Sequence, residues 1–565
     1  MSSNKQLIEC VPNFSEGVDM GIIKQITNEI EAVEGCKLID VDPGKATNRT
    51  VVTFVGTPDE VVEAAFRAVK RAQELIDMSK HHGAHPRFGA TDVCPLVPVA
   101  NITMDEVVAY AHKLAKRIGD ELGIPVYCYE FAARTPERRN LANCRAGEYE
   151  VLPNKLKDAA WKPDFGPATF LPRTGAIAVG ARNFLVAYNV NLNTTSTRRA
   201  NAVAFDVREK GRPQREGGKP SGKIMKDEKG NTIMIPGTLK GTKAIGWYIE
   251  DYGIAQVSMN ITSIKVAPVH LCFDEVCRCA ANRGLRVTGC EIVGLIPKSV
   301  LIDAGKYYLA KQQRSLGVSE DEIMKVAIKS MGLDDLKPFD PKEKVIEFLI
   351  EDHSQKKLVD LTCTGFCDET ASESPAPGGG SVSAYMGALA ASLGTMVANL
   401  TGGKAAYDDE WEKFSDVAVK GQALKTELLH LVDEDTNAFN KIMNAFGLPK
   451  KTDEEKAARS AAIQEATKFA TEVPFHTMQK SFEAFEVCRA MVEWGNPASV
   501  TDGGVGALAA RSAVMGAHLN VKINASSLKD EAFKNDILAK AAELEARAIN
   551  EEAEIIKIVN EKIGL

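Results

Sequence analysis

The sequence predicts an α/β protein: two ferredoxin-like α+β halves in tandem, followed by an all-α helical bundle domain. Three observations lead to this fold class. Strand and helix patterns follow the order β-α-β-β-α-β in the first part of the chain, and the same order recurs after residue 185. Beyond 351–357 the strand patterns stop, and alanine, leucine, glutamate and lysine dominate. A chain of 565 residues is also too long for one hydrophobic core.

The first half is defined by β-branched runs, turn residues and helix starts. Thr57-Pro58 followed by two acids is a strong helix start, and Thr103 with Glu106 forms a capping-box pattern. Asp42-Pro43-Gly44 has the composition of a turn between two strands. The predicted elements are a strand over 6–12, a helix over 21–33, strands over 37–41 and 50–56, a helix over 58–80, a strand over 92–98 and a helix over 104–118.

The second half repeats this pattern, and a helical region follows it. Strands are expected over 185–192, 243–249, 254–261 and 285–295, with helices over 198–208, 269–282 and 337–352. Later helices are expected over 381–400, 409–445, 452–493, 505–518 and 528–563, with breaks or kinks at turns and at Pro474. These patterns place α/β subdomains at 1–184 and 185–350, a linker at 351–357 and a helical domain at 358–565.

Composition indicates an ordinary soluble globular protein. Hydrophobic residues make up 44% and charged residues 26% of the chain, and the net charge of −7 argues against a general nucleic-acid binder. The twelve cysteines lack the spacing of a disulfide framework or a zinc site. Because we find no signal peptide and no apolar run long enough to cross a bilayer, we expect a cytoplasmic protein without nucleic-acid or membrane partners.

The stretch from Lys80 to Pro95 is the first candidate for chemistry. It holds three of the nine histidines of the chain, all within five residues. Gly83 permits a tight backbone path, and Pro86 pushes the residue before it toward an extended conformation. A histidine held in this way suits proton transfer near neutral pH. We therefore select His85 as the candidate catalytic group and regard His81 and His82 as ordinary loop residues.

A metal site and a plain surface loop are the alternatives for the histidine cluster. The histidines are adjacent and then three residues apart, which lacks the i, i+4 geometry of a helical zinc site, so we expect no metal. A solvated loop with incidental histidines fits the composition as well as a catalytic role does.

Two further segments of the α/β part have alternative interpretations. Two halves in series create a cleft, where small-molecule sites commonly lie. The connection over 161–182 is rich in glycine and proline, and either lines this cleft or serves as a plain linker. The insert over 209–243 carries many basic residues, which favours a solvated surface hairpin; the alternative is a landing surface for an anionic substrate.

The helical part contains a glycine run that is a second candidate site. Glycines before an alanine-rich helix leave backbone N–H groups bare at its N-terminus, where a carboxylate or phosphate can bind. The candidate residues are Gly378, Gly379, Gly380 and Ser381. A flexible turn is the alternative, and the missing Lys-Ser/Thr of a Walker loop disfavours nucleotide binding.

An acidic stretch later in the helical part supplies another candidate. Asp435 shares a helix face with Leu431 and Phe439, so it is either an interhelical hydrogen-bond partner or a site acid with a raised pKa. Asp433 and Glu434 are expected to face water.

Several motifs together resemble one enzyme family. The first part is similar to glutamate formiminotransferase through Ile8-Glu9-Cys10-Val11-Pro12-Asn13-Phe14-Ser15-Glu16-Gly17, Gly83-Ala84-His85-Pro86-Arg87 and Arg145-Ala146-Gly147-Glu148-Tyr149-Glu150. The last part is similar to the formimidoyltetrahydrofolate cyclodeaminase module through Pro375-Ala376-Pro377-Gly378-Gly379-Gly380-Ser381-Val382 and Leu431-Val432-Asp433-Glu434-Asp435-Thr436-Asn437-Ala438-Phe439. Because the motifs follow in order over nearly the whole chain, the sequence resembles the bifunctional formimidoyltransferase-cyclodeaminase family.

The resemblance implies two consecutive reactions. N-formimidoyl-L-glutamate passes its formimino group to N5 of the cosubstrate tetrahydrofolate, and glutamate is released. The helical module then closes the ring to 5,10-methenyltetrahydrofolate and releases ammonia, in histidine degradation and one-carbon metabolism. The family also implies ring-like homo-oligomers that pass polyglutamylated folate between their sites.

The resemblance further assigns residues. The transferase histidine falls on His85 and the cyclodeaminase aspartate on Asp435. The folate-lining segment falls on Gly166, Pro167, Ala168, Thr169, Phe170, Leu171, Pro172, Arg173, Thr174 and Gly175. Vertebrate members have an acidic residue in place of Ala84 and lack the basic insert after Glu209, but neither difference removes a group that the chemistry needs.

The chemistry agrees with these assignments. Attack of N5 on an amidine carbon gives a tetrahedral adduct that must lose one proton and gain another on the departing nitrogen, and one histidine can do both. We hypothesise that Asp42 orients His85 or holds the cationic formiminium group, and that Asp435 moves the proton when ammonia leaves. Two alternatives remain: the helical module is a methenyltetrahydrofolate cyclohydrolase, or the chain is a folate-binding scaffold.

Overall fold

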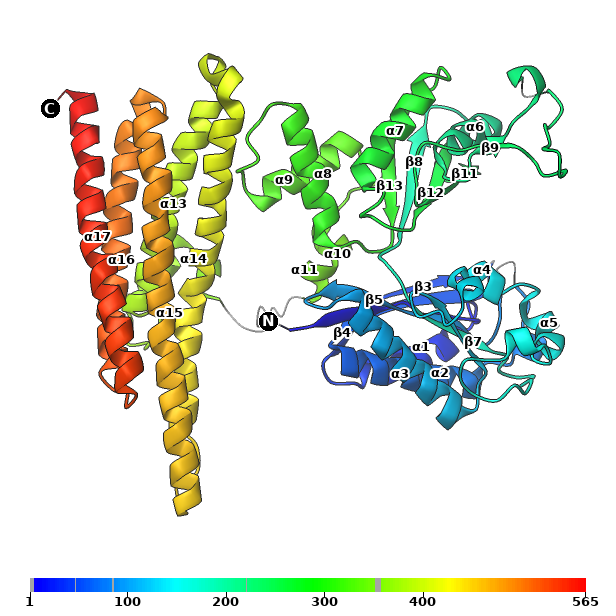
Figure 1. Ribbon diagram of the computed structural model, residues 1–565, viewed down its shortest axis with the longest axis horizontal. Coiled ribbons are helices and arrows are strands. Elements are labelled where there is room, and N and C mark those ends of the chain that lie inside the picture. Colours follow the sequence, from blue (N-terminus) through cyan, green and yellow to red (C-terminus); the bar gives the residue numbers. More distant parts are fainter. Residues whose placement is uncertain (1–4, 46, 84–85, 220, 351–356, 565) are drawn as a thin grey trace. The chain divides into compact units, whose positions relative to one another are not determined.

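The structure is a computed structural model that describes residues 5–45, 47–83, 86–219, 221–350 and 357–564 (Figure 1). The chain divides into two compact units, Met1–Ala304 with Ile328–Asp352 and Gly305–Ala327 with His353–Leu565. The first unit is mixed α/β and the second is helical, which confirms the fold class at this coarse level. The predicted catalytic residue His85, Ala84 beside it, and most of the predicted linker lie outside the described residues.

A seven-stranded sheet forms the first half of the α/β unit. Its strands are β1 (Leu7–Cys10), β2 (Asn13–Phe14), β3 (Cys36–Gly44), β4 (Arg49–Gly56), β5 (Thr91–Ala100), β6 (Val126–Glu130) and β7 (Ile177–Ala181). β1 and β2 lie between β4 and β5, and β3 extends the sheet beyond β4; all these pairs are antiparallel. On the other side β5, β7 and β6 follow one another in parallel.

Three helices cover one face of this sheet: α1 (Met20–Glu31), α2 (Pro58–Leu75) and α3 (Met104–Leu122) (Figure 1). Strand alternation decides which side chains reach them. In β1, Ile8 and Cys10 are buried in the core shared with the helices, while Glu9 faces the opposite side. The predicted capping box of α3 is present, because Thr103 Oγ1 accepts the Glu106 N–H at 3.3 Å. The opposite face is covered only in part: Tyr127 packs with Leu152 and Leu156, and Val55 packs with Ile346 and Ile350. The remainder, called the uncovered face below, is free to line a site.

Three expectations for this half differ from the structure. β3 continues through Asp42-Pro43-Gly44, where we expected a turn, because Gly44 still pairs with Arg49; Pro43 is tolerated on this edge strand. α2 ends at Leu75, and a 3₁₀ turn over Met78–Lys80 takes the place of its expected last turn. β6 and β7 were not expected. β7 is short and fully buried, so it lacks the alternation by which exposed strands are recognised.

A four-stranded antiparallel sheet forms the second half of the α/β unit. Its order is β11 (Thr242–Ile249), β12 (Ile254–Ile261), β8 (Val186–Leu192) and β13 (Val287–Val293). α6 (Thr197–Val207) and α7 (Val269–Ala281) pack on one face of it. The basic insert contains a small hairpin of β9 (Arg212–Pro213) and β10 (Met234–Ile235), in line with the surface-hairpin interpretation.

Shorter helices either complete the α/β unit or, like α8 and α9, lie partly in the helical unit. They are α4 (Leu141–Cys144), α5 (Glu148–Lys155), α8 (Lys298–Lys311), α9 (Glu320–Met331), α10 (Pro341–Lys344) and α11 (Ile346–Ile350). The single helix expected over 337–352 is thus two short ones. Extended backbone at Val345, which pairs with Ile296, interrupts the helical hydrogen bonding between them.

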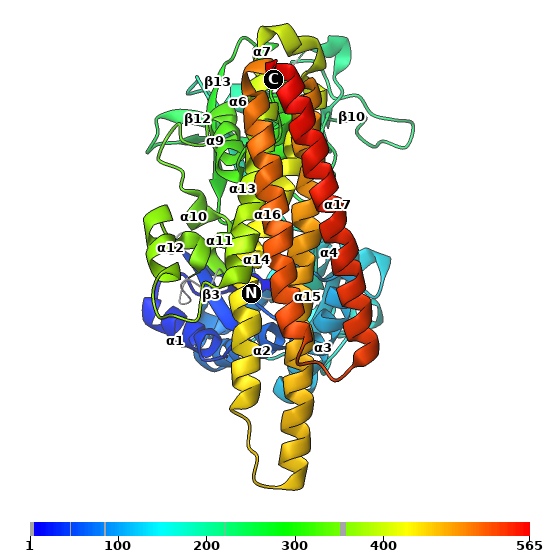
Figure 2. The same ribbon diagram turned by 90° about the vertical axis from the view of Figure 1, so that its left-hand side faces the viewer.

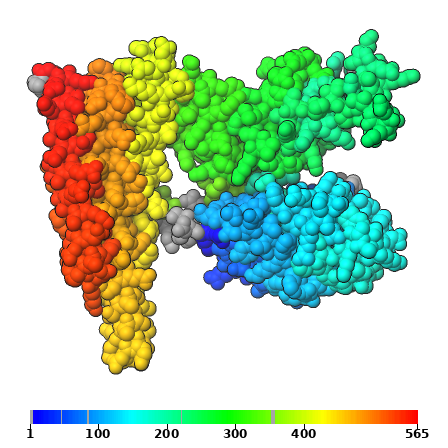
Figure 3. Space-filling model, viewed as in Figure 1, coloured from blue at the N-terminus to red at the C-terminus, as the bar shows by residue number. Residues whose placement is uncertain are grey.

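Long helices form the second unit: α12 (Cys363–Thr370), α13 (Gly379–Gly402), α14 (Trp411–Phe446), α15 (Asp453–Trp494), α16 (Val500–Ala525) and α17 (Glu531–Ile563). The last five run alongside one another, and one end of the α14–α15 pair projects past the others (Figures 2 and 3). The expected helices are all present. α15, however, continues through Pro474 without ending, and α16 begins five residues earlier than expected, at Val500.

Residues 305–327 group with the helical unit rather than with the α/β unit. The Leu316 N–H donates to Ser415 Oγ at 2.9 Å, and the carbonyl of Gly317 accepts from Asn399 Nδ2 at 2.9 Å. These hydrogen bonds fix the segment around Leu316 and Gly317 to α13 and α14.

α13 is the central helix of this unit, and its composition is unusually apolar. Contrary to our expectation, it is long and apolar enough to cross a membrane by length and composition alone. However, 61% of its most apolar window is buried inside the helical unit, and buried core helices of globular proteins pass the same test.

Candidate active sites

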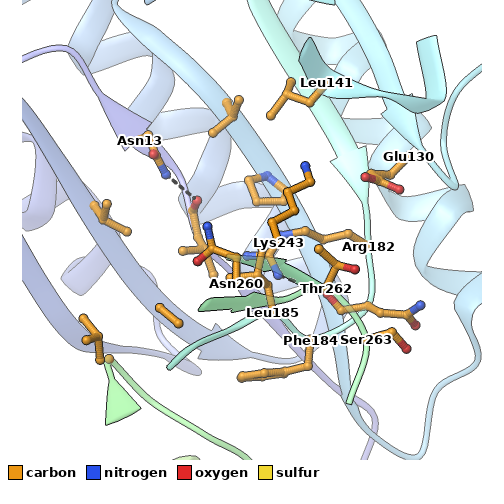
Figure 4. A pocket seen from close by; sticks show the side chains of 18 of the residues that line it. Asn13, Glu130, Leu141, Arg182, Phe184, Leu185, Lys243, Asn260, Thr262 and Ser263 are labelled. Atoms are coloured by element: carbon orange, nitrogen blue, oxygen red, sulfur yellow. Dashed lines mark hydrogen bonds between the residues drawn. The ribbon is translucent and has the colours of Figure 1, made fainter. Parts of the chain in front are cut away.

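A cleft of about 1420 Å³ lies within the α/β unit, lined by residues of both of its sheets. The first sheet contributes its uncovered face, and the second contributes β8, β11, β12 and β13. Figure 4 shows side chains of both halves, such as Asn13 and Lys243, within this cleft. The volume exceeds the roughly 300–1,000 Å³ of a typical small-molecule pocket.

Asp42, one of the predicted site residues, lines this cleft from β3. Arg49 lines it from β4, and its Nη1 donates to Asn13 Oδ1 at 2.8 Å. Arg145 also lines the cleft and forms an ion pair with Asp92, which is only 1% exposed. Burial raises the pKa of the Asp92 carboxyl to about 6, although Arg145 and Arg49 pull it down. Two guanidinium groups and the carboxyl of Asp42 therefore line the cleft, while Asp92, which does not line it, pairs with Arg145.

Glu9 adds an acid with an unusual pKa to the same cleft. Its side chain lies on the uncovered face of the first sheet, and the residue is 3% exposed. Burial raises the pKa of Glu9 to about 7, while Arg182 opposes the rise. Burial, with help from Asp42, also raises the pKa of Asp40 nearby. Carboxyl groups that exchange protons near neutral pH are what acid–base chemistry requires.

The described residues on the N-terminal side of His85 are anchored beside this cleft. His81 Nε2 lies 2.8 Å from the carbonyl of Asn48, and Asn48 Nδ2 donates to the carbonyl of His82 at 2.9 Å. An added Cβ at Gly83 would collide with the backbone of Thr47, so only glycine fits there. The segment from His81 to Gly83 is thus held against Thr47 and Asn48, directly before Arg49.

His81 differs from our expectation of an ordinary loop residue. It is only 8% exposed, and burial lowers the pKa of its ring, while the hydrogen bond to Asn48 opposes that shift. His81 therefore anchors the loop.

The predicted folate segment, Gly166 to Gly175, does not line the cleft, although the structure describes all ten residues. It runs instead beside both flanks of the loop that holds His85. The Met78 N–H donates to the carbonyl of Arg173 at 2.9 Å, and the Ala90 N–H donates to the carbonyl of Thr174 at 2.7 Å. The ring of Phe170 lies 5.5 Å from that of Tyr149. Its folate-binding role stays a prediction.

In the helical unit the two predicted candidates meet. Asp435 Oδ2 accepts hydrogen bonds from the Ser381 N–H at 2.8 Å and from Ser381 Oγ at 3.0 Å. The anion at the N-terminus of α13 is therefore the carboxylate of Asp435 itself. An added Cβ at Gly380 would collide with this carboxylate, so glycine is required for the contact. Gly378 and Gly379 precede Gly380, and Gly379 begins α13.

The pKa of Asp435 is set by two opposing effects. Burial raises it, while the hydrogen bonds from Ser381 lower it. The pKa of Asp433 is also raised by burial, because this side chain does not face water as we expected: it accepts the Leu358 N–H at 2.7 Å. Among the described residues, no group of three or more His, Cys, Asp or Glu side chains is placed to hold a metal ion.

The fold and the two sites define an enzyme of two modules. One is an α/β module with a large charged cleft, and the other is a helical module with a half-buried carboxylate on a helix N-terminus. Three family-level matches follow the same order: the formiminotransferase domain, N-terminal subdomain, over residues 7–182, the formiminotransferase domain over 187–351, and formiminotransferase-cyclodeaminase over 362–543.

Individual relatives extend these matches. The chain is 42% identical over 532 residues to formimidoyltransferase-cyclodeaminase of Gallus gallus, covering 94% of each chain. It is 41% identical to glutamate formimidoyltransferase of Streptococcus pyogenes over 54% of this chain and 93% of the relative. Methenyltetrahydrofolate cyclohydrolase of Methylorubrum extorquens is 41% identical over 36% of this chain and 98% of the relative. The chain belongs to the formimidoyltransferase-cyclodeaminase family.

Sequence reasoning missed most of the charged groups in the cleft. Arg145 begins one of the motifs that carry the family resemblance, but nothing local distinguishes it or Arg49 from surface arginines. Glu9 did leave a signal, since it is the one charged residue in the apolar run of β1. A lone acid on the uncovered face of a buried strand points to a site.

Proposed function

We propose that this chain catalyses two consecutive steps of folate chemistry, one in each unit. In the first, the formimino group of N-formimidoyl-L-glutamate passes to N5 of tetrahydrofolate, and glutamate leaves. In the second, the product closes to 5,10-methenyltetrahydrofolate, and ammonia leaves. The observation that carries the proposal is the match to bifunctional relatives over 94% of both chains, together with two separate acid–base sites.

For the transfer step we assign the proton relay to His85 and an orienting or charge-holding role to Asp42. The support comes from the surroundings of His85. His81 and His82, which precede it in the chain, are hydrogen-bonded to Asn48. Arg49, the residue after Asn48, lines the cleft that Asp42 also lines. Attack by N5 and departure of glutamate each need one proton moved, and a positioned imidazole contributes about 100-fold or more to each.

We assign folate binding to the segment from Gly166 to Gly175. Its support is the pair of backbone hydrogen bonds to Met78 and Ala90, which hold it next to the loop of His85. The folate is tetrahydrofolate with a polyglutamate tail, and a charged cleft of about 1420 Å³ gives such a tail room. No metal takes part in either step of this scheme.

For the cyclisation step we assign the proton transfer to Asp435. N10 attacks the formimino carbon, and the departing nitrogen must be protonated to leave as ammonia. A partly buried carboxyl whose pKa is raised by burial keeps a proton to nearer neutral pH, and Ser381 fixes its orientation. Gly380, directly before Ser381, leaves the space in which this carboxylate lies.

We also propose the finer features of organisation. The strand order β3-β4-β1-β5 supports a ferredoxin-like first half, with domains at 1–184, 185–350 and 358–565.

Exposed apolar side chains on two packed helices support a ring-like homo-oligomer. They are Leu389, Met396 and Leu400 on α13, and Val505, Leu508, Leu519 and Ile523 on α16. A cytoplasmic role in histidine degradation fits these reactions.

The test is an absorbance assay for methenyl-folate from formimidoylglutamate and tetrahydrofolate, with glutamate and ammonia measured in parallel. We expect equal amounts of all three products. Glutamate release without methenyl-folate would remove the second activity from the proposal, and no glutamate release would remove the first.

A second candidate for the helical module has its own support, namely the 41% identity to a methenyltetrahydrofolate cyclohydrolase. A cyclohydrolase uses the methenyl product rather than making it from the formimino compound. Ammonia release from supplied 5-formimidoyltetrahydrofolate favours the cyclodeaminase; hydrolysis of methenyl-folate without any ammonia release favours the cyclohydrolase. A folate-binding scaffold would show neither.

A further inference from the structure

Three cationic side chains converge on one part of the α/β cleft from separate elements. Arg139 ends the 3₁₀ turn Pro136–Arg139, Arg182 follows β7, and Lys243 belongs to β11 of the second sheet. All three line the cleft and act electrostatically on the carboxyl of Glu130, which lines it too. Figure 4 shows Glu130, Arg182 and Lys243 in this part of the cleft.

Among the described residues, these three cations have no ion-pair partner, because no carboxylate oxygen lies within 4.0 Å of Arg139, Arg182 or Lys243. The side chain of Arg182 donates to the carbonyl of its neighbour, Asn183, at 3.0 Å. Glu9, the other acid that Arg182 influences, has its pKa raised by burial to about 7, so near pH 7 it carries only part of a charge. Positive charge is therefore in excess here.

The position of Glu130 is also constrained. It is the last residue of β6 and has φ +52°, a left-handed conformation that is uncommon for a residue other than glycine. Such conformations persist where the surroundings enforce them, commonly at ligand sites. Glu130 is thus a constrained residue on which all three cations act.

An arrangement of this kind suits a ligand with more than one carboxylate. Cations that lack ion-pair partners give strong charge-assisted hydrogen bonds to incoming carboxylates. One cation would suffice for a single carboxylate, whereas three from both halves of the unit match the two carboxylates of a glutamate. Both substrates of the proposed transfer carry such a group: the formimidoyl donor, and the glutamyl end of folate.

We infer that Arg139, Arg182 and Lys243 form the subsite that binds the carboxylates of a glutamyl group during formimino transfer. The inference rests on the proposed function for the identity of the substrates. Because Lys243 comes from the second half of the α/β unit, the subsite is complete only when both halves meet at the ligand.

The experiment compares Lys243→Met and Arg139→Gln with the unmodified protein; both residues are exposed, so their loss leaves the core intact. Lys265→Met is the matched control, an exposed lysine of the same half that does not line the cleft. KM and kcat are measured for formimidoylglutamate and for tetrahydrofolate, and L-glutamate binding is measured by calorimetry. We expect at least a tenfold rise in one KM with kcat within about twofold, and no change in Lys265→Met.

The two sources of the glutamyl group are separated by the acceptor. If the subsite holds the donor, the KM for formimidoylglutamate and the Kd for glutamate both rise at least tenfold. If it holds the folate tail, the KM for tetrahydrofolate rises instead, and the defect disappears with tetrahydropteroate, which lacks the glutamyl group. Either result supports the subsite.

Unchanged KM values and unchanged glutamate binding in both variants would overturn the subsite, as would a fall in kcat alone. The proposed function fails separately. If the unmodified protein binds glutamate but transfers no formimino group, and Lys243→Met weakens that binding tenfold, the subsite stands without the transfer reaction.

Discussion

The two sites of this protein are built in opposite ways. The cleft of the α/β unit draws charged side chains from many strands and turns, and burial raises the pKa values of its acids Glu9 and Asp40. The site of the helical unit is a single carboxylate, Asp435, held by the first turn of α13. A helix N-terminus supplies aligned N–H groups by itself, so one opposing residue completes the arrangement.

This contrast has a consequence for robustness. In the helical site the geometry depends on one close contact, so small changes at Gly380 or Asp435 should be severe. In the cleft, charge is shared among several groups, so single substitutions away from His85 should be milder. The predictions below test this difference, beginning with the largest expected effect.

Replacing Asp435 should remove the second activity. Asp435→Asn keeps the shape and a hydrogen-bond acceptor for Ser381, but it removes the exchangeable proton, so cyclisation should fall about 100- to 10,000-fold. Release of ammonia from supplied 5-formimidoyltetrahydrofolate measures it. Glu434→Gln, the neighbour on α14, is the control and should cyclise normally. Ammonia release by Asp435→Asn at the unmodified rate would eliminate this assignment.

Gly380→Ala should damage the same step without touching the acid. Its Cβ would collide with the Asp435 carboxylate and push it away from Ser381, and displacement of a catalytic group by about 1 Å costs on the order of 100-fold. The matched control is Gly378→Ala, where the nearest atom to an added Cβ is 3.8 Å away. Equal cyclisation rates for the two variants would show that the close contact has no catalytic importance.

Asp42→Asn should have a smaller effect, confined to the cleft. The formiminium group or His85 would lose one charged partner, so the transfer rate should fall about tenfold, while cyclisation of supplied substrate stays unchanged as an internal control. Glutamate release from formimidoylglutamate measures the transfer. A normal transfer rate would remove Asp42 from the proposed site.

Glu9→Gln should alter stability more than rate. The pKa of Glu9 rises from 4.5 to about 7 on burial, so the folded state keeps this proton while the unfolded state loses it. The contribution of Glu9 to the free energy of unfolding is therefore fully present below about pH 4.5. It is lost as the pH rises toward 7, and the loss is at most about 3 kcal/mol. Glu9→Gln should escape this loss and be more stable than the unmodified protein at pH 8, with little difference at pH 4.5.

Hydrogen exchange of the β1 and β5 peptides at the two pH values measures this effect. The control is Glu34→Gln, an exposed carboxyl. If Glu9→Gln raised the stability equally at both pH values, packing rather than proton binding would be responsible.

The sequence indicated the helical site better than the cleft. A glycine run before an apolar helix and a lone acid on an apolar helix face are both local patterns, and Gly380 and Asp435 were chosen for those reasons. That they meet could not be deduced, because the packing of α13 against α14 depends on contacts between residues more than fifty positions apart.

The cleft was harder to predict for a physical reason. Its residues are brought together by strand order. β6 and β7 were not expected because short parallel strands that are almost entirely buried have no alternating pattern. Because β7 and β6 were not predicted, the sequence could not place Arg182, which follows β7, or Glu130, which ends β6, in the cleft. Asp42 lines the cleft from within a strand instead of a turn, and its catalytic role stays a prediction.

The central claim is that the two reactions occur at separate sites, with His85 acting only in the first. The most direct measurement is ammonia release by His85→Ala from two starting points. With supplied 5-formimidoyltetrahydrofolate, the account predicts the unmodified rate; with formimidoylglutamate and tetrahydrofolate, it predicts none. Loss of ammonia release from both starting points, or from neither, would contradict it.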